Sequence, residues 1–514
     1  MVFINLFTSE MSFKAKQKNF FIIYLFIFIE INCLNSFVIK NNFFRNSSKE
    51  SLCLIEGDIV CPQDYDENDT TFYMASLDRN KLWLTRLIPY LIASTYTPSE
   101  KQLIKEAISE LEGKTCVKFK ELSSEPNDED FIYIRPIQGC YSSIGRATGK
   151  QDLSLTSDCL NKGKGTVIHE LIHALGIWHE HTRPDRDSYV FVELGNIIPG
   201  LESNFKIRPN NFVDMLGEPY DYYSIMHYGI YDFSIDPNSR PTLRVLDQKI
   251  DVKQVGQRTH VSDLDKKKLD KLYECQIQSC EKPVQPSGGS STGDDFKVGA
   301  IVKFECDSGL TLTGSHESFC RYDGRWSGQV VQCLDKPLHY CNFESTGSEM
   351  CGWTHTSDTQ FDWLRKSGAT LQPDSGPIED FTYETSVGHY ILMETSPPRR
   401  RGDVAKIQTP ELSSPSGMVC VSFAYYMWGQ KLGTLGLYLS EPSVGTKLVW
   451  ELNGVQGPKW TQHKILVKTT VNAAFHLIFE GIVGLRDYSD IALDEVLVIA
   501  CNEDEALKNG FKDS

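Results

Sequence analysis

The residues with the clearest chemical potential lie in one short stretch, residues 165–190, which reads GTVIHELIHALGIWHEHTRPDRDSYV. His169 and His173 are four positions apart, so a helix would place both on one face, where their imidazoles can share one metal ion. Glu170 directly follows the first histidine, where its carboxylate can take a proton from a metal-bound water. The pattern therefore predicts a hydrolytic metal centre on a helix.

The same stretch supplies a third ligand and a way to reach it. Gly176 allows the backbone to leave the helix, and His179 can then return as a third nitrogen ligand. Three protein ligands with one open position are typical of catalytic zinc, whereas structural zinc sites are closed. The bland alternative is a pair of core or surface histidines that bind nothing, and the extension through Gly176 and His179 disfavours it.

A second motif lies downstream and reads Ser224-Ile225-Met226-His227-Tyr228. A methionine turn beneath the metal is expected after a zinc motif of this extended kind. Alone, the pentapeptide would be an unremarkable strand end. Together with the three histidines it is a specific signature.

Elements that could position these residues are also visible in the sequence. Thr97 to Glu100 form a capping-box pattern with proline at the first helical position, and a helical stripe of apolar residues follows until Gly113. Strand-like runs cover residues 116–122 and 130–137. The apolar stripe is interpreted as core packing and not as a cofactor site.

Residues from about Asn80 to Cys275 resemble the astacin metalloproteases, a branch of the metzincins. The resemblance rests on His169, Glu170, His173, Gly176, His179, Glu180, Arg183, Asp185, Arg186 and the pentapeptide from Ser224 to Tyr228. It implies an α+β catalytic domain with a zinc helix and a mixed β-sheet, and zinc bound by the three histidines. It also implies Glu170 as general base and later as the acid for the leaving amine. Tyr228 is implied as an additional ligand that swings away to hydrogen-bond the oxyanion.

The resemblance further implies structural roles for Gly176, Glu180 and Met226. Residues 140–146 resemble the family's edge strand above the cleft, to which a substrate adds by backbone pairing. Arg258 matches a position where some astacins carry an arginine that faces the residue after the scissile bond, and it would favour Asp or Glu there. The alternative is a solvated surface arginine in a charged C-terminal stretch, and the sequence does not decide between the two.

Ahead of this domain, residues 36–79 resemble an astacin pro-segment through Ile55-Glu56-Gly57-Asp58-Ile59. Gly57 permits a close backbone approach, and Asp58 is expected to bind the zinc in place of water, which would make the enzyme a zymogen. A Gly-Asp pair is more often a turn, so this role depends on its place upstream of a protease. Arg79 is the expected activation site.

The front end of the chain predicts secretion. A basic flank precedes ten apolar residues, 20–29, which are too few for the roughly 20 that span a bilayer, so residues 1–35 are interpreted as a signal peptide. No later segment approaches about 18 uninterrupted apolar residues, which predicts a mature protein without a transmembrane segment. Asn46 and Asn68 begin the two glycosylation sequons, both in the pro-segment.

Composition points to the same compartment. Fifteen cysteines in 514 residues are many for a cytosolic enzyme and favour disulfides and a secretory route. The formal charge of −16 argues against a general binder of nucleic acids or anionic membranes, because long-range electrostatics would repel both. The length predicts about three domains.

Two further modules follow the protease-like region, residues 80–278. Through its four cysteines and the tripeptide at 324–326 (GRW), the segment of residues 279–334 resembles a sushi (complement control protein) module, a small all-β unit. Residues 287–295 within it are Gly/Ser-rich and predict a flexible loop. Through residues 341–344 (CNFE), 351–353 (CGW) and 490–495 (DIALDE), the segment of residues 340–502 resembles a MAM domain, an all-β sandwich. Residues 503–514 are charged and predict an unordered tail.

A pairing scheme for the cysteines follows from these resemblances. The implied disulfides are Cys116–Cys275 and Cys140–Cys159 in the protease, Cys280–Cys320 and Cys306–Cys333 in the sushi module, and Cys341–Cys351 and Cys420–Cys501 in the MAM domain. Spacing alone would allow three connectivities for the four sushi cysteines. Cys53 and Cys61 flank Asp58 and could close a small loop around it, and Cys33 is left over at the signal boundary.

These observations predict a secreted, extracellular zinc endopeptidase with one Zn²⁺ per catalytic domain. Its expected partners are protein and peptide substrates, extracellular or cell-surface partners through the sushi and MAM modules, or a second copy through the MAM domain. No nucleic-acid partner is expected. The competing hypothesis is an adhesion protein whose protease domain is idle, and the intact histidines, Glu170 and Tyr228 argue against it. The tripeptide at residues 401–403, Arg-Gly-Asp, is interpreted as a chance match to an integrin-binding motif.

Overall fold

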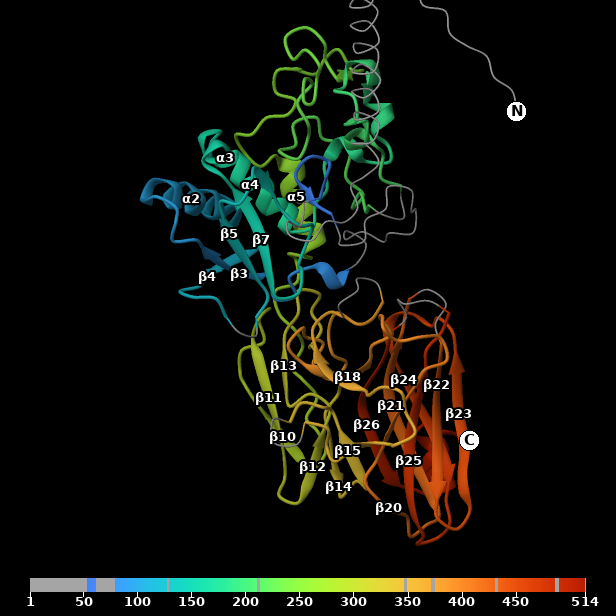
Figure 1. Ribbon diagram of the computed structural model, residues 1–514. Helices are drawn as coiled ribbons and strands as arrows, with labels where there is room; N and C mark the ends of the chain where they lie inside the picture. The colour runs from blue at the N-terminus through green and yellow to red at the C-terminus, as the bar shows by residue number, and fades with distance from the viewer. Residues whose placement is uncertain are drawn as a thin grey trace, which may run out of the picture. The chain divides into compact units, whose positions relative to one another are not determined.

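The computed structural model describes residues 53–61, 79–126, 129–209, 213–345, 349–370, 375–429, 433–485 and 490–513. The expected signal peptide, Cys33, both sequons (Asn46 and Asn68) and most of the pro-segment lie outside these ranges. A region of mixed helices and strands is followed along the chain by two regions built almost entirely of strands (Figure 1). Among the described residues, no helix has both the length and the apolar character that a bilayer crossing requires.

The first region, residues 79–275, is built around a sheet in the order β4-β3-β5-β7-β6. The strands are β3 (Leu87–Ile92), β4 (Lys118–Glu121), β5 (Phe131–Arg135), β6 (Cys140–Tyr141) and β7 (Lys150–Leu155). Neighbouring strands are parallel except for β6, which runs antiparallel to β7 at one edge. That edge is where the sequence placed the substrate-binding strand.

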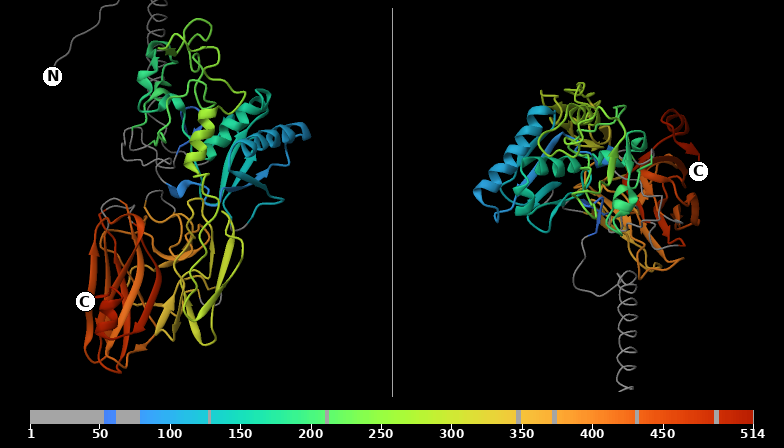
Figure 2. Two further views of the ribbon diagram at one scale, coloured as in Figure 1. Left: turned by 180° about the vertical axis from the view of Figure 1, so that it is seen from behind. Right: turned by 90° about the horizontal axis from the view of Figure 1, so that it is seen from above.

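Helices share one apolar core with this sheet. They are α2 (Pro98–Lys114), α3 (Ser157–Asn161), α4 (Lys164–Ala174) and α5 (Asp263–Leu272). The predicted capping box of α2 is confirmed, because Thr97 caps the backbone of Glu100 and the Glu100 carboxylate accepts the Thr97 N–H at 2.8 Å. Leu171 of α4 and Leu269 of α5 are buried in the same core, and both views show the two helices side by side (Figure 2).

Between α4 and α5 the chain has little regular structure, so its path is fixed by side chains and short turns. The short elements here are η2 (Glu180–Thr182), η3 (Arg186–Ser188), β8 (Val190–Val192), η4 (Leu194–Asn196), η5 (Glu202–Phe205) and β9 (Leu243–Val245). Ahead of the sheet lie η1 (Arg79–Lys81) and a hairpin of β1 (Leu54–Ile55) and β2 (Ile59–Val60), within the segment that the sequence predicts as a pro-segment.

The second region corresponds to the predicted sushi module. Its strands are β10 (Gly289–Thr292), β11 (Ile301–Cys306), β12 (Leu310–Thr313), β13 (Glu317–Phe319) and β14 (Gln332–Asp335). The predicted flexible loop at residues 287–295 is wrong, because residues 289–292 form β10 and pair with β11. A Cβ on Gly289 would lie 2.5 Å from the Glu305 carbonyl oxygen, so glycine there serves a close approach of two backbones.

The third region is a sandwich of two antiparallel sheets that share one core. One sheet contains β17 (Leu364–Ser367), β18 (His389–Met393), β26 (Ile491–Ala500), β21 (Met418–Met427), β24 (Gly457–Lys468) and β15 (His339–Cys341). The other contains β16 (Thr354–His355), β19 (Val404–Gln408), β25 (Ala474–Ile482), β22 (Thr434–Glu441), β23 (Gly445–Asn453) and β20 (Leu412–Ser413). This agrees with the predicted all-β sandwich.

The predicted unordered tail is wrong. Residues after 502 form α6 (Glu503–Lys508) and β27 (Lys512–Asp513), which pairs in parallel with β24. Asn502 caps the helix in a capping box with Glu505, and Ala506 and Phe511 are buried against the Cys420–Cys501 disulfide. The prediction was based on the high charge of the segment and overlooked the apolar Ala506 and Phe511 and the capping pair Asn502 and Glu505.

Disulfides close all three regions. The structure contains Cys116–Cys275, Cys140–Cys159, Cys280–Cys320, Cys306–Cys333, Cys341–Cys351 and Cys420–Cys501. Cys53 and Cys61 are also disulfide-bonded. This set of bonded cysteines is typical of a protein folded in an oxidising compartment.

Candidate active site

The first two histidines of the site come from α4. The helix is buried from Gly165 to Ala174, and His169 and His173 lie one turn apart on the face that points toward the metal-ligand cluster. The chain leaves the helix at Gly176, whose φ of +102° lies in the left-handed region. That turn brings His179 back beside the other two imidazoles.

The three rings converge on one point. The Nε2 atoms of His179 and His169 are 3.2 Å apart, and those of His173 and His179 are 3.3 Å apart. Tetrahedral zinc with bonds of about 2.0–2.1 Å separates its nitrogen ligands by about 3.3 Å, so the spacing fits this ion. With a carboxylate oxygen of Asp58, the ligand atoms all lie within 4.8 Å of one another.

The outer ring nitrogens are also held, which fixes how each ring faces inward. Nδ1 of His169 hydrogen-bonds the Ile225 carbonyl oxygen at 2.8 Å, and Nδ1 of His173 does the same with Ile177 at 2.8 Å. Because Nδ1 donates outward in both rings, Nε2 keeps its lone pair for a metal. The three-histidine arrangement with Asp58 is therefore a zinc centre.

Asp58 occupies the fourth position. Its Oδ2 lies 3.2 Å from His169 Nε2, and its Oδ1 lies 3.3 Å from His179 Nε2. Burial acts to raise the pKa of Asp58, but charge interaction with His179 and polar contacts with His169 and His179 hold this pKa well below its ordinary value. An ionised carboxylate oxygen aimed at three imidazoles is the chemistry of a fourth ligand.

The β1–β2 hairpin carries Asp58 to this position. The backbone N–H of Ser142 donates to the Asp58 carbonyl at 3.0 Å, and the Val60 N–H donates to the Ser142 carbonyl at 3.0 Å. Gly57, with φ of +82°, makes the turn, and a Cβ on it would lie 2.5 Å from the Phe233 ring. The hairpin therefore pairs, in parallel, with the chain just beyond β6, on the predicted substrate-binding segment.

Glu170 lies inside the site, with its side chain buried and Oε2 without a hydrogen-bond partner. Burial raises the pKa of Glu170 well above its ordinary value, and the nearby charge of Asp58 adds to the effect. A carboxylate that readily takes a proton, next to a metal ligand, is suited to general base catalysis.

Tyr228 lies beside the cluster, with its ring centroid 4.8 Å from that of His179. Its ring stacks on His181 with centroids 3.6 Å apart, and its hydroxyl donates to the backbone carbonyl of Glu56. Phe205 and Phe233 pack around the same ring. The hydroxyl is thus held by the β1–β2 hairpin.

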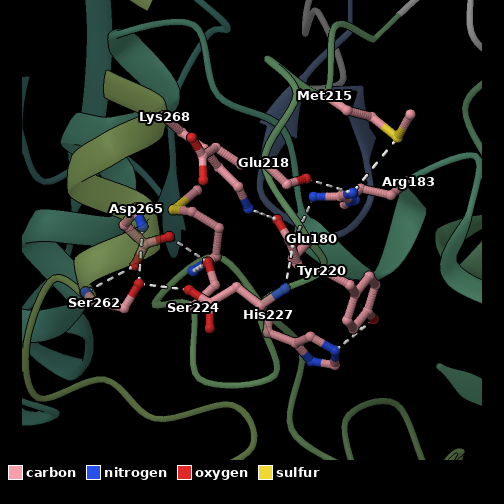
Figure 3. Close-up of polar contacts among 12 residues, drawn as sticks. Glu180, Arg183, Met215, Glu218, Tyr220, Ser224, His227, Ser262, Asp265 and Lys268 are labelled. Atoms are coloured by element: carbon pink, nitrogen blue, oxygen red, sulfur yellow. Dashed lines mark hydrogen bonds and ion pairs between the residues drawn. The ribbon is translucent and has the colours of Figure 1, made fainter. Parts of the chain in front are cut away.

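Beneath the histidines, a buried charge network ties three segments together (Figure 3). Glu180, directly after the third histidine, lies between Lys268 of α5 and Arg183, with Lys268 Nζ 2.5 Å from Oε2 and Arg183 Nη1 3.1 Å from Oε1. The Glu180 N–H also donates to the Met226 carbonyl at 3.0 Å. The methionine turn and the third ligand are therefore parts of one hydrogen-bonded unit.

The methionine turn is also held by α5. Asp265 accepts the Ser224 hydroxyl at 2.5 Å and the Ile225 N–H at 2.9 Å, and it is almost fully buried (Figure 3). His227 Nε2 lies 2.7 Å from the Tyr220 hydroxyl. Sequence reasoning missed Asp265 and Lys268, although their i, i+3 spacing on a capped helix is visible in the chain.

Arg258 lies next to the site and not in the solvent. Its Nη1 donates to the His227 carbonyl at 2.9 Å, and a Cβ on Gly165 of α4 would lie 1.7 Å from the Arg258 carbonyl oxygen. Burial lowers the pKa of Arg258, and the charges of Asp232 and Asp58 oppose that shift. Arg79, in contrast, donates to the Leu272 carbonyl at 2.9 Å and is not part of the cluster.

Family comparisons agree with this geometry. The Astacin peptidase family model matches residues 75–274. Models of the Sushi repeat (SCR repeat) and of the MAM domain, meprin/A5/mu, match residues 280–333 and 341–502. The recognition of an astacin region followed by sushi and MAM modules is confirmed.

Curated relatives are proteases of the same kind. The chain is similar to zinc metalloproteinase nas-4 of Caenorhabditis elegans, with 40% identity over 43% of this chain and 69% of that protein. It is similar to astacin-like metalloendopeptidase of Mus musculus, with 37% identity over 63% of this chain and 68% of that protein. Meprin A subunit beta of Mus musculus is 29% identical over 79% of this chain and 48% of its own length. With its three-histidine zinc centre, the chain belongs to the astacin family of zinc metalloendopeptidases.

Proposed function

We propose that this protein is a secreted zinc endopeptidase, made as a zymogen, that hydrolyses peptide bonds of extracellular proteins. One observation carries the proposal: a carboxylate from an upstream hairpin is aimed at three imidazoles that are spaced for zinc. His169, His173 and His179 hold the metal, and Asp58 blocks it in the precursor. When bound, zinc supplies a Lewis acid that polarises the scissile carbonyl and acidifies the attacking water.

Three residues of the chain carry out the other steps of the reaction and of substrate recognition. Glu170 Oε2 accepts a proton from the attacking water and returns it to the nitrogen of the leaving amine. Once Glu56 has left with the pro-segment, the Tyr228 hydroxyl can donate to the substrate oxygen that gains negative charge. Arg258, beside His227, offers a guanidinium to an acidic side chain after the scissile bond.

Latency and location complete the proposal. Cleavage after Arg79 removes the hairpin with Asp58, and the Cys53–Cys61 loop and the two glycans leave with it. The sushi and MAM modules direct the enzyme to extracellular partners or to a second copy through the MAM domain. Their bonded cysteines are compatible with an extracellular site.

Glu170→Ala in the activated protein tests the catalytic proposal. It removes the proton acceptor but none of the metal ligands, so cleavage of a peptide library should fall by about 10²- to 10⁴-fold while one zinc per chain remains bound. Zinc content by elemental analysis is measured on the same sample. Equal activity of variant and parent would refute the mechanism, and inactive parent enzyme with bound zinc would favour the idle-protease alternative.

A further inference from the structure

The pro-segment buries a second carboxylate, that of Glu56, beside the metal centre. The binding of Asp58 to the metal, which explains latency, does not explain why Glu56 is there. The Glu56 side chain is 1% exposed. Its Oε1 accepts a hydrogen bond from Arg208 Nε at 2.6 Å, and its Oε2 accepts one from His179 Nδ1 at 2.8 Å. Each oxygen of this buried carboxylate thus accepts a hydrogen bond from a strong donor, which is the arrangement of a carboxylate-binding site.

The two donors belong to the catalytic domain and not to the pro-segment. The Arg208 N–H donates to the Thr182 carbonyl at 2.7 Å, which anchors the backbone three residues after His179. The Arg208 guanidinium lies over the Trp178 ring, 4.6 Å from its centre. Both anchors remain when residues 53–61 leave, so the guanidinium stays beside the zinc ligand.

An apolar wall borders these donors. Ile55 and Ile59 of the pro-segment pack on Trp178, and Ile144 and Val213 lie at the edge of the same cluster. Removal of the hairpin would uncover this wall together with one guanidinium and one imidazole N–H. An acidic side chain, with an aliphatic stem and a charged end, matches that surface.

Contacts with the catalytic domain hold both the main chain and the side chain of Glu56. Its own carbonyl accepts the Tyr228 hydroxyl, and Asp58, two residues on, lies at the metal and pairs with Ser142. The hairpin thus fills the cleft with both its main chain and its side chains. Glu56 is the side chain that it places on Arg208.

We propose that Arg208 and His179 Nδ1 form a carboxylate-binding subsite of the cleft, that Glu56 fills it in the precursor, and that the mature enzyme uses it for a Glu or Asp side chain of its peptide substrate. The inference rests on the proposed function and deepens it. The subsite is separate from Arg258, whose guanidinium contacts the His227 carbonyl. Two acidic positions of a substrate would then be recognised by two arginines.

A binding experiment tests the subsite without turnover. Fluorescent peptides LIEGDIV (residues 54–60) and its Glu→Gln analogue are titrated by anisotropy into the zinc-loaded, activated full chain and its Arg208→Gln variant. With the parent, the analogue should bind about 10- to 100-fold more weakly, because a buried donor loses its charged acceptor. With Arg208→Gln the two peptides should bind within about threefold of each other. An equal preference for Glu in both proteins would overturn the proposal.

A cleavage experiment tests the use of the subsite in substrates. Paired peptides that carry Glu or Gln at each position around the scissile bond are compared by kcat/KM. At one position the parent should prefer Glu by about tenfold, and Arg208→Gln should lose that preference. Arg244→Gln, an exposed arginine on β9 with 56% of its side chain accessible, is the matched control.

Together, the binding and cleavage experiments distinguish a failure of this inference from a failure of the proposed function. If the parent cuts neutral peptides but no Glu preference depends on Arg208, the subsite is wrong and the protease proposal stands. If the parent cuts nothing, the binding arm still decides the subsite. Arg208→Lys keeps the charge but not the planar fork, and partial recovery of Glu binding would distinguish loss of the contact from a folding defect. If Arg208→Lys does not recover Glu binding but has the zinc content and unfolding midpoint of the parent, the protein is folded, and the peptide preference of Arg208→Gln decides the proposal.

Discussion

The carboxylate of Asp265 accepts a hydrogen bond from the Ile225 N–H at 2.9 Å, and the carbonyl oxygen of the same Ile225 accepts a hydrogen bond from Nδ1 of His169 at 2.8 Å. Helix α5 therefore orients a zinc ligand through a single residue of the methionine turn. Outer partners of this kind set the tautomer and direction of a ligating histidine. The relationship makes α5 part of the metal centre although it contributes no ligand.

Asp265→Asn should lower the zinc affinity by about 10-fold, because the amide replaces one of two acceptor oxygens that hold the turn. Competition with a chromogenic chelator measures the affinity independently of activity. Asp263→Asn, an exposed acid in the first turn of the same helix, is the control and should bind zinc as the parent does. Equal affinities in all three proteins would contradict the role of α5.

Lys268→Met should destabilise the catalytic domain by about 3–5 kcal/mol, because the Glu180 carboxylate would lose one buried partner and keep its charge. Denaturant unfolding measures the loss. Lys271→Met, whose amine is on the exposed side of α5, should cost little. Glu180→Gln combined with Lys268→Met should recover part of the loss. A double variant as unstable as the sum of the two singles would argue against a coupled pair.

Asp58→Ala should weaken the latency of the uncut precursor. The hairpin would lose the carboxylate that fills the fourth position of the site and would be held only by its remaining contacts, such as its backbone pairing with Ser142. Hydrolysis of a short fluorogenic peptide is measured with Arg79→Gln present in both proteins, so that processing at Arg79 cannot supply the activity. A silent Asp58→Ala precursor would count against the aspartate as the latency ligand.

Arg258→Ala should remove a preference for Asp or Glu directly after the scissile bond. Peptide-library profiling of the activated enzyme would show the change at that position, with about a 10-fold loss for acidic peptides and parent-like rates for neutral ones. The position affected should differ from the one read by Arg208. No shift after the cleavage site would rule out Arg258 as the selector.

Raising the pH should weaken the MAM sandwich through Asp490. Burial raises the pKa of this carboxyl from 3.8 to about 6, so the folded state holds its proton longer than the unfolded chain does. Its contribution to stability is therefore complete below about pH 4 and is lost as the pH rises to about 6, by up to about 3 kcal/mol. Asp490→Asn should flatten this part of the dependence in denaturant unfolding between pH 4 and 7. Parallel curves for variant and parent would refute the assignment.

The zinc ligands could be predicted because their chemistry lies in local spacing. His169, His173 and His179 fall within 11 residues, and a helix followed by one glycine is enough to bring them together. Arg208 and Glu56 lie 152 residues apart, and Lys268 and Glu180 lie 88 apart. No periodicity links such pairs, since the irregular chain between α4 and α5 decides which of them meet.

Parts of the fold were also predictable from the sequence, and other parts were not. The capping box at Thr97 predicted α2, and the resemblance of residues 340–502 to a MAM domain implied the sandwich of strands. The tail was missed because its charges outweighed a capping pattern, Asn502 followed by Glu505, that is present in the sequence. At residues 289–292, glycine and serine suggested a loop, but main-chain pairing to β11 needs no large side chains.

The Cys116–Cys275 bond joins residues 159 positions apart, so it closes a covalent ring around the histidines and the methionine turn. A single cut anywhere in that ring would open a peptide bond without producing two molecules. Such damage would be invisible by mass on a non-reducing gel, and the fragments would separate only after reduction. A single cut within the ring therefore leaves a nicked chain whose two parts the disulfide still holds together.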